Sequence, residues 1–319
     1  MYPFHNILFP TDFGVHSRPA LKYAAAFARD SNGRLVVVNV QDEKVPSNLL
    51  ALRQADLEVQ ERRWLLQLQT DTRELLADSV LKNVEVETVF VEGDAPSEVA
   101  QVAVDYGADL ITVMTRTRKR FSRAFGASMA EDIIAEAPCP VLAIRSPQHE
   151  FVHERDTGIH LHLKRIFLAT NFRPSSVAAT QLATQIANFT GAQLHAVYVI
   201  GDYFEQISAM FPEGGLAALT RLRSYVSERM SHLADSGDRR VQTHIAEGRP
   251  YEEVVRLAAR QDADLIVIGT AVHNSLFGGS VVLGSEVERV IRNAPCPVLC
   301  VPAARVVTPL PALVTQPVT

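Results

Sequence analysis

The sequence predicts an α/β protein made of two tandem copies of an open, mostly parallel five-stranded sheet with helices on both faces. Three observations lead to this fold class. The chain has 319 residues, more than the roughly 250–300 at which one hydrophobic core stops growing. Its two halves repeat one another in sequence. Within each half, short β-branched runs alternate with longer helical patterns, which is typical of βαβ units.

The repeat is visible in segments that recur in the same order. The matched pairs of segments are residues 7–13 with 166–172, residues 108–111 with 263–266, and residues 137–142 with 294–299. Because the offset between the members of each pair is nearly constant, one unit has been duplicated. We assign the first copy to residues 1–146 and the second to 164–303, with 147–163 as linker and 304–319 as tail.

The expected elements follow the same order in both copies. Strands are predicted near residues 5–10, 34–40, 84–91, 109–114 and 140–145, and again near 164–169, 192–199, 240–246, 264–269 and 297–302. Arg18–Arg29 and Ser175–Asn188 place alanines and large apolar residues at helical spacing, and Leu49–Leu81 is long enough for a helix of many turns. Since βαβ crossovers are right-handed, helices should cover both faces of each sheet.

The linker and the tail show no such pattern. Residues 147–163 carry four histidines and three acidic residues without a clear period, so we expect a solvated linker, with a histidine metal site as the lesser alternative. The tail holds Pro309, Pro311 and Pro317 and almost no charge, which suits a segment that does not pack.

Composition argues against several classes of function. Hydrophobic residues make up 47% of the chain and charged residues 21%, as in globular proteins. The net charge of −5 argues against a nucleic-acid partner. No apolar run approaches the roughly 20 residues of a membrane span, and the first residues do not resemble a signal peptide. Three cysteines are too few for a disulfide framework, so we expect a cytoplasmic protein without membrane contact.

Four features, in the same order in both halves, carry a resemblance to a known family. They are a strand ending at Asp12 or Asn171, a Glu-Gly turn at Gly93 or Gly248, a strand beginning Ala-Asp-Leu-Ile, and a last helix that runs into Ala-Pro-Cys-Pro-Val-Leu. On these features each half resembles the universal stress protein domain, which has a Rossmann-like fold. The resemblance implies that the last strand of each copy lies at a sheet edge, so we expect the two last strands to pair within one chain.

The nucleotide-binding members of this family hold adenine nucleotide, commonly ATP, with a loop of the form G-x2-G-x9-G-[S/T]. Glycines let backbone N–H groups approach phosphate oxygens, and the N-terminus of the following helix favours an anion. In the second copy Gly269 and Gly284-Ser285 match this loop. Thr270, beside Gly269, is a further candidate, and Gly278 and Gly279 lie inside the loop, where they could compensate for a missing glycine. Asn171, at the end of the first strand, would then face the nucleoside.

Both copies depart from the family pattern. The second has Val272 in place of the middle glycine, and eleven residues rather than nine precede Gly284. The first keeps Asp12 but has only Gly126 and Ser128 for the phosphate roles, with Met114 in place of the first glycine. Its loop instead carries a basic cluster of Arg116, Arg118, Lys119, Arg120 and Arg123. The second copy is therefore the better candidate for phosphate.

Each of these residues also has a purely structural interpretation. Asp12 could cap the helix that follows it, Gly284 and Ser285 could simply begin a helix, and the basic cluster could be a solvated surface. Gly269, at a strand end, has less structural reason to be glycine. Cys139 and Cys296, each between prolines, are expected to be ordinary core residues.

Our leading hypothesis is a stress-response protein that binds adenine nucleotide as a regulatory ligand and is not an enzyme. The alternative is a nucleotide-free tandem scaffold for a protein partner or a homodimer. A slow ATPase is the third interpretation, although the loop offers no evident base or metal carboxylate and no metal is expected.

Overall fold

The computed structural model describes residues 3–41, 54–115, 129–145, 149–155, 158–201, 212–235, 241–274 and 281–303. In the first copy it contains β1 (Asn6–Pro10), α1 (Arg18–Ser31), β2 (Arg34–Gln41), α2 (Gln54–Leu76), the 3-10 turn η1 (Ser79–Leu81), β3 (Glu85–Glu92), α3 (Ala95–Asp105), β4 (Leu110–Met114), α4 (Met129–Glu136) and β5 (Val141–Ile144). The expected tail, residues 304–319, lies outside the described residues.

The second copy repeats this order of strands and helices, and its described residues include a short hairpin. Its elements are β8 (Arg165–Ala169), α5 (Pro174–Thr190), β9 (Gln193–Gly201), α7 (Pro212–Asp235), β10 (Gln242–Gly248), α8 (Pro250–Arg260), β11 (Leu265–Thr270), the hairpin β12 (Val272–Asn274) and β13 (Val281–Leu283), α9 (Ser285–Asn293) and β14 (Val298–Pro302). All ten expected strands are present, and their ends lie within two residues of the prediction.

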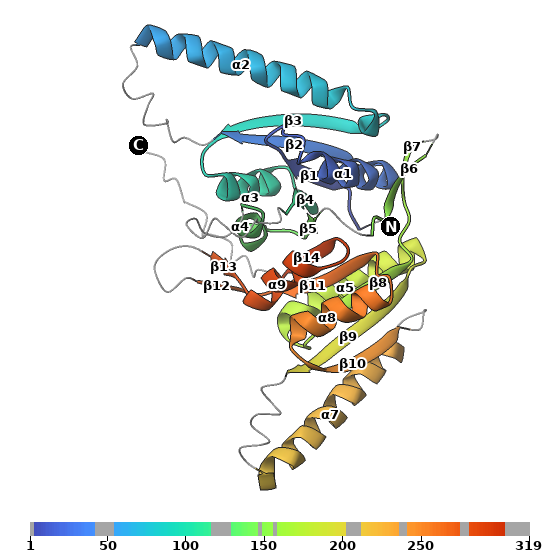
Figure 1. Cartoon of the computed structure of the whole chain (residues 1–319). Coiled ribbons are helices and arrows are strands. Elements are labelled where there is room, and N and C mark those ends of the chain that lie inside the picture. The colour runs from blue at the N-terminus through green and yellow to red at the C-terminus, as the bar shows by residue number, and fades with distance from the viewer. Residues whose placement is uncertain are drawn as a thin grey trace, which may run out of the picture.

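One ten-stranded sheet runs through both copies, in the order β10-β9-β8-β11-β14-β5-β4-β1-β2-β3 (Figure 1). Within each copy the strands are parallel, and strand order switches direction between β1 and β4 and between β8 and β11. In open parallel sheets such a switch opens a crevice outside the carboxyl ends of the strands. The fold therefore supplies two equivalent places for a ligand.

The two copies are joined by their last strands, as the sequence predicted. β14 pairs antiparallel with β5, with Leu299 opposite Leu142. Beside this seam, the guanidinium of Arg292 on α9 donates to both carboxylate oxygens of Glu131 on α4, at 2.8 Å each. The Glu131 side chain is only 4% exposed, whereas that of Arg292 is 53% exposed. Sheet pairing and an ion pair thus connect the copies directly.

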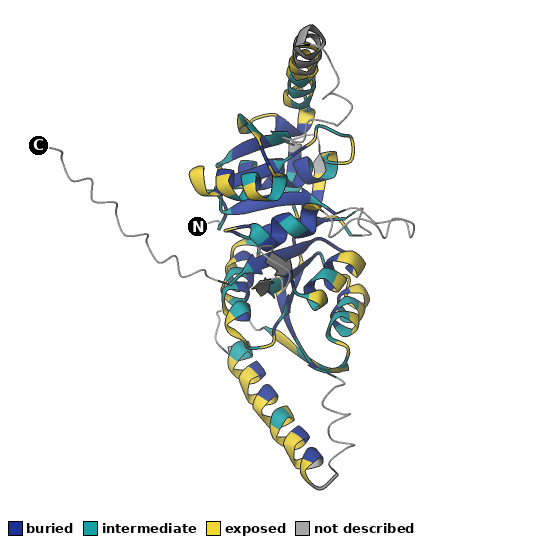
Figure 2. Ribbon diagram, turned by 90° about the vertical axis from the view of Figure 1, so that its left-hand side faces the viewer, coloured by how far each residue is buried: buried dark blue, intermediate teal, exposed yellow. Residues whose placement is uncertain are grey.

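The core lies on both faces of the sheet because the central strands alternate their side chains. In β1, Ile7 and Phe9 pack on one face with α1, while Leu8 packs on the other with residues of α3 and α4. Four buried alanines in α1, residues 24–26 and 28 on either side of Phe27, let that helix approach the sheet closely. Figure 2 shows the buried residues concentrated along the sheet.

The segment between the copies corrects an expectation. Residues 147–163 were expected to be a solvated linker, yet they contain a hairpin of β6 (Val152–Arg155) and β7 (Gly158–Leu161). Phe151, Val152 and Ile159 are at most 2% exposed. The ring of Phe151 lies 4.8 Å from that of Tyr23 on α1. The segment is therefore part of the core, because its apolar residues have α1 to pack against.

Candidate functional site

The candidate site of the second copy begins at the end of β8, beside β11. Asn171 follows β8 and is exposed. Its Oδ1 accepts hydrogen bonds from the backbone N–H of Arg173 at 3.0 Å and from the hydroxyl of Ser176 at 2.6 Å. The side-chain oxygen is thus used to shape the start of α5. Within the described part of the chain no protein group accepts from the Asn171 amide nitrogen, which leaves a donor on the surface.

Position 269 needs a glycine for a packing reason that the sequence did not reveal. A Cβ at this position would lie 2.0 Å from the backbone oxygen of Ser175 and 3.1 Å from the Cα of Ser176. The first turn of α5 is therefore seated against the end of β11, and only glycine allows this approach. In the first copy Met114 stands at the equivalent position, and α1 begins later, at Arg18. The expectation that Gly269 lacks a packing role was wrong.

Gly284 is different, because none of the described residues around it requires glycine. Its φ of −63° and ψ of 136° suit any residue. Of the residues that the structure describes, a Cβ there would meet just the backbone oxygen of Ala271, at 3.7 Å. Gly284 is the N-cap of α9, and no side chain caps that helix end. Its missing side chain thus leaves open space directly over the first N–H groups of α9.

The hairpin explains how the two ends of the long loop meet. Val272 pairs with Leu283, so the chain leaves β11, runs out along β12 and returns along β13 to Gly284. Gly269 and Gly284, fifteen positions apart, are in this way brought to the same end of the sheet. β13 also contacts α4 of the first copy, and Leu283 is buried in the core face shared with that helix. The candidate site therefore borders the first copy.

The charges beside Gly284 are acidic, and both carboxylates have partners. Glu286 accepts a hydrogen bond from the backbone N–H of Tyr251 at 3.0 Å and so caps the start of α8. Glu288 lies 3.7 Å from Arg292. Burial first, and the nearby Glu131 second, raise the pKa of Glu288. Glu286 is thus engaged by α8 and Glu288 by Arg292 of α9 itself, and neither lies within 4 Å of the Cβ position of Gly284.

An aromatic and cationic cluster beside Asn171 was not predicted. Phe172 has a positive φ of 57°, and its ring stacks on Tyr198 of β9 at 5.2 Å. The guanidinium of Arg229, from α7, lies 4.9 Å from the centre of the Phe172 ring. The repeated sequence offered one signal, because Phe13 matches Phe172 and has the same unusual backbone, with φ of 58°.

In the first copy the structure describes only part of the candidate site. Asp12 is exposed, and its Oδ1 accepts from the backbone N–H of Gly14 at 2.9 Å, forming a local turn. The N-cap of α1 is Ser17, so Asp12 does not cap that helix. Gly126, Ser128 and the basic cluster of the first copy lie outside the described residues, as do Gly278 and Gly279 of the second.

The remaining candidates differ in exposure. Thr270 is 2% exposed, so its side chain does not face open solvent. Ser285 is exposed at the first position of α9. Cys139, Cys296 and Cys300 are free and buried, and burial raises the pKa of the Cys139 thiol to about 12. Such thiols are unreactive core residues, as expected.

Metal ligands and membrane spans are not evident in the described part of the chain. Over those residues no group of three or more His, Cys, Asp or Glu side chains could hold a metal ion. In the same residues, every helix is too short or too polar to cross a bilayer.

Structural comparison agrees with the fold. A universal stress protein of Archaeoglobus fulgidus superimposes with a TM-score of 0.62 over 93% of this chain and 98% of its own, at 19% identity. A protein described as a putative universal stress protein from Pseudomonas aeruginosa gives a TM-score of 0.54 over 94% of each chain, at 20% identity. At these identities the similarity concerns the fold alone.

Sequence comparison identifies the family. A universal stress protein of Methanocaldococcus jannaschii is 33% identical over 148 residues, which cover 43% of this chain and 81% of that protein. One from Thermus aquaticus is 34% identical over 141 residues, 43% of this chain and 98% of that protein. The model of the universal stress protein family matches residues 3–145 and again 162–302. The chain therefore belongs to the universal stress protein family and contains its domain twice.

Proposed function

We propose that the second copy binds an adenine nucleotide, ATP in the first instance, as a regulatory ligand in the stress response. The phosphates would lie at Gly284 and Ser285, on the N-terminal N–H groups of α9, and the nucleoside would lie toward Asn171. Helix N-termini favour anions through their free N–H groups and the helix dipole.

The observation that carries the proposal is the open space at Gly284. This glycine has an ordinary backbone conformation, and among the described residues a Cβ would meet nothing closer than the Ala271 oxygen at 3.7 Å. A side chain could be accommodated there without strain, so the absence of one has no explanation in packing. It is explained if a ligand must approach the backbone at the end of the sheet where strand order switches.

The described carboxylates near the site support a role as regulatory ligand rather than substrate. Hydrolysis needs a group that orients or deprotonates water. Glu286 and Glu288 are the carboxylates in the first turn of α9, and they are engaged by Tyr251 and Arg292. Neither is offered as a base.

The direct experiment is to heat purified protein, remove the precipitate and identify released nucleotide by chromatography, followed by calorimetric titration of the nucleotide-free protein with ATP. We expect an adenine nucleotide in the supernatant or saturable ATP binding with a Kd below about 1 mM, roughly −4 kcal/mol. The absence of both would overturn the proposal.

A nucleotide-free scaffold is the second candidate, and one observation favours it. The β5–β14 pairing and the Arg292–Glu131 ion pair join the copies without help from any ligand. The same experiment separates the candidates, because a scaffold would release no nucleotide and show no saturable heat with ATP.

A further inference from the structure

The ten-stranded sheet ends at two equivalent strands, β3 in the first copy and β10 in the second, which lie at opposite ends of the sheet in Figure 1. β3 pairs with β2 and β10 with β9, and in the described part of the chain neither has a second strand beside it. An outermost strand presents unpaired N–H and C=O groups to which another strand can add. The chain itself closes its two inner edges in this way, because β5 and β14 pair antiparallel. β3 and β10 are the edges that this pairing leaves.

Charge protects the β3 edge. Three of its eight residues are exposed glutamates, Glu85, Glu87 and Glu92. Charged side chains on an edge strand oppose pairing with another chain, and a second β3 would add its own carboxylates to the same seam. β3 is therefore a poor surface for self-association.

The β10 edge lacks such protection. β10 contains no proline, and all seven of its residues pair with β9. Apart from His244, whose pKa is lowered by burial, its one ionisable side chain is Glu247. The Oε1 of Glu247 accepts a hydrogen bond from the Nε of Arg223 on α7 at 2.9 Å, and a terminal guanidinium nitrogen lies 2.7 Å away. Ile245 is 43% exposed, so this strand offers apolar surface in place of like charges.

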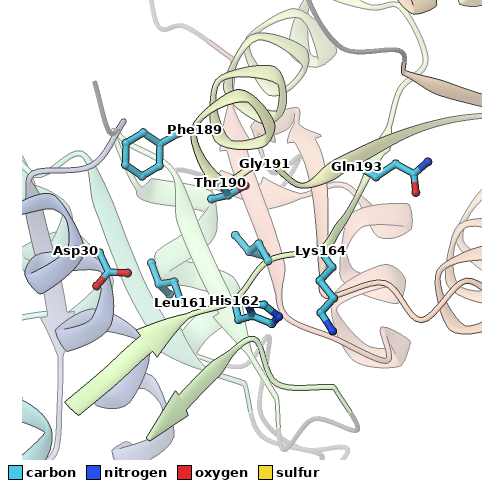
Figure 3. Close-up of a pocket in the computed structure, with 9 residues that line it drawn as sticks. Asp30, Leu161, His162, Lys164, Phe189, Thr190, Gly191 and Gln193 are labelled. Carbon is cyan, nitrogen blue, oxygen red and sulfur yellow. The ribbon is translucent and has the colours of Figure 1, made fainter. Parts of the chain in front are cut away.

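Two helices pack on β10, from opposite faces of the sheet. α7 contributes Val226 to the core face that holds Leu194 of β9. α8 contributes Val254 to the other face, which holds Val197. The cavity of about 460 Å³ shown in Figure 3 is lined by Gln193, the first residue of β9, but by no residue of β10. Among the described residues, the outer edge of β10 is thus neither covered by another strand nor part of that cavity.

A second copy of β10 fits this edge in antiparallel register about Ile245. Each Ile245 then lies opposite its counterpart, and each Thr243 lies opposite the partner's Glu247. These three side chains project from one face, because side chains alternate along a strand. The Thr243 hydroxyl can donate to the carboxylate opposite, the two isoleucines bury apolar surface, and no two like charges face each other. The strand is therefore complementary to itself in charge and in hydrophobicity.

We propose that β10 is a dimerisation edge, at which two copies of this chain pair their β10 strands antiparallel about Ile245 and continue the sheet across a twofold axis. Such a pairing is closed, because each chain uses the same surface and no further copy can add there. The inference does not depend on nucleotide binding in the second copy.

Sedimentation equilibrium of the full chain tests the proposal, over a concentration series at fixed salt. We expect a monomer–dimer equilibrium with a Kd below about 100 μM. Ile245→Glu places two carboxylates opposite each other at the centre of the seam and should raise this Kd at least about tenfold. The matched control is Phe90→Glu, because Phe90 holds the same place in the first copy, two residues before a Glu-Gly turn, and is 45% exposed. That variant should leave the Kd unchanged.

Cross-linking tests the register. Cys139, Cys296 and Cys300 are buried, so Ile245→Cys supplies an accessible thiol that the wild type lacks. Directly opposed residues of an antiparallel pair have Cα atoms about 4.5–5.5 Å apart, which is within disulfide range. With diamide as the added oxidant, Ile245→Cys should form a disulfide-linked dimer, and Phe90→Cys should form much less.

Three results would overturn the proposal. The first is a chain that stays monomeric up to about 1 mM, as it would if β10 paired with a different protein. The second is a Kd that is unchanged in Ile245→Glu, and the third is an equally strong cross-link in Phe90→Cys. Because Ile245→Cys introduces no charge, the cross-link decides the question even where Ile245→Glu affects folding.

Discussion

Replacing Arg292 by methionine should destabilise the whole chain, because it removes the cation from a buried carboxylate at the seam between the copies. Glu131 is 4% exposed and receives two hydrogen bonds of 2.8 Å from the Arg292 guanidinium. Methionine keeps the apolar stem of the side chain but leaves the Glu131 charge without this partner. The unfolded chain is affected little, so the loss appears in the free energy of unfolding.

The magnitude follows from the unequal exposure of the partners. Removing one member of a buried ion pair typically costs about 3–5 kcal/mol. Arg292 is 53% exposed, so water reaches part of the pair, and we expect a loss of about 2–3 kcal/mol. Glu131→Gln should lower the free energy of unfolding less, by about 1 kcal/mol, because the half-exposed Arg292 guanidinium keeps Glu288 as a partner. The substitution also removes the repulsion between Glu131 and Glu288 that helps raise the pKa of Glu288.

The assay is urea unfolding followed by circular dichroism, at one pH and salt concentration, for the wild type, both single variants and the double variant. The double variant should be no less stable than Arg292→Met alone, which gives a coupling energy of about 1 kcal/mol or more. A loss below about 0.5 kcal/mol for Arg292→Met, or a larger loss for Glu131→Gln, would show that the ion pair does not stabilise the seam.

Three further predictions concern stability. Burial first and His244 second lower the pKa of His195 from 6.5 to about 4. The neutral ring therefore contributes its full stabilisation above pH 6.5, and this contribution is lost as the pH falls toward 4. Between pH 7 and 5 the free energy of unfolding of the wild type should fall by about 2 kcal/mol more than that of His195→Phe, and equal losses would contradict this. Gly269→Ala should cost at least about 2 kcal/mol in urea unfolding, because its Cβ would lie 2.0 Å from the Ser175 oxygen, and a cost under about 0.5 kcal/mol would refute that contact. Phe151→Ala should cost about 3–5 kcal/mol if the hairpin belongs to the core, whereas a solvated linker would lose almost nothing.

The repeat and the strands could be predicted from sequence because each depends on short-range pattern. β-branched runs such as Val36–Val38 are bounded by turns and helical patterns, and the duplication supports each assignment a second time. The pairing of β5 with β14 could also be expected, because short apolar strands at a sheet edge need a partner. The Arg292–Glu131 pair could not, since it joins residues 161 positions apart whose contact depends on the seam itself.

The linker was misjudged although a signal was present. Apolar and histidine residues alternate from Ile159 to Leu163, which is the period of a half-buried strand. Four histidines and three acidic residues obscured it. The buried Phe151 contact with Tyr23 depends on the position of α1 and could not be inferred from the segment alone.

In the candidate site the sequence identified the glycines, but it could not show why each position needs a glycine. From the sequence Gly269 had less structural reason to be glycine than Gly284, yet in the structure Gly269 admits a neighbouring helix, and Gly284 faces open space among the described residues. This distinction depends on where α5 begins, at Pro174, and on the hairpin that returns Gly284 to Ala271. Both are tertiary features that no local pattern encodes.

The most direct test of the nucleotide site is calorimetric titration of ATP into Gly284→Val, beside the wild type and the control Gly214→Val on α7, where a glycine also has open surroundings. The account predicts at least a tenfold loss of affinity in Gly284→Val, about 1.4 kcal/mol, and wild-type affinity in the control. Gly126→Val, in the first copy, should have much less effect. Saturable ATP binding that survives Gly284→Val, or equal losses from Gly284→Val and Gly126→Val, would contradict the assignment of the phosphates to the second copy.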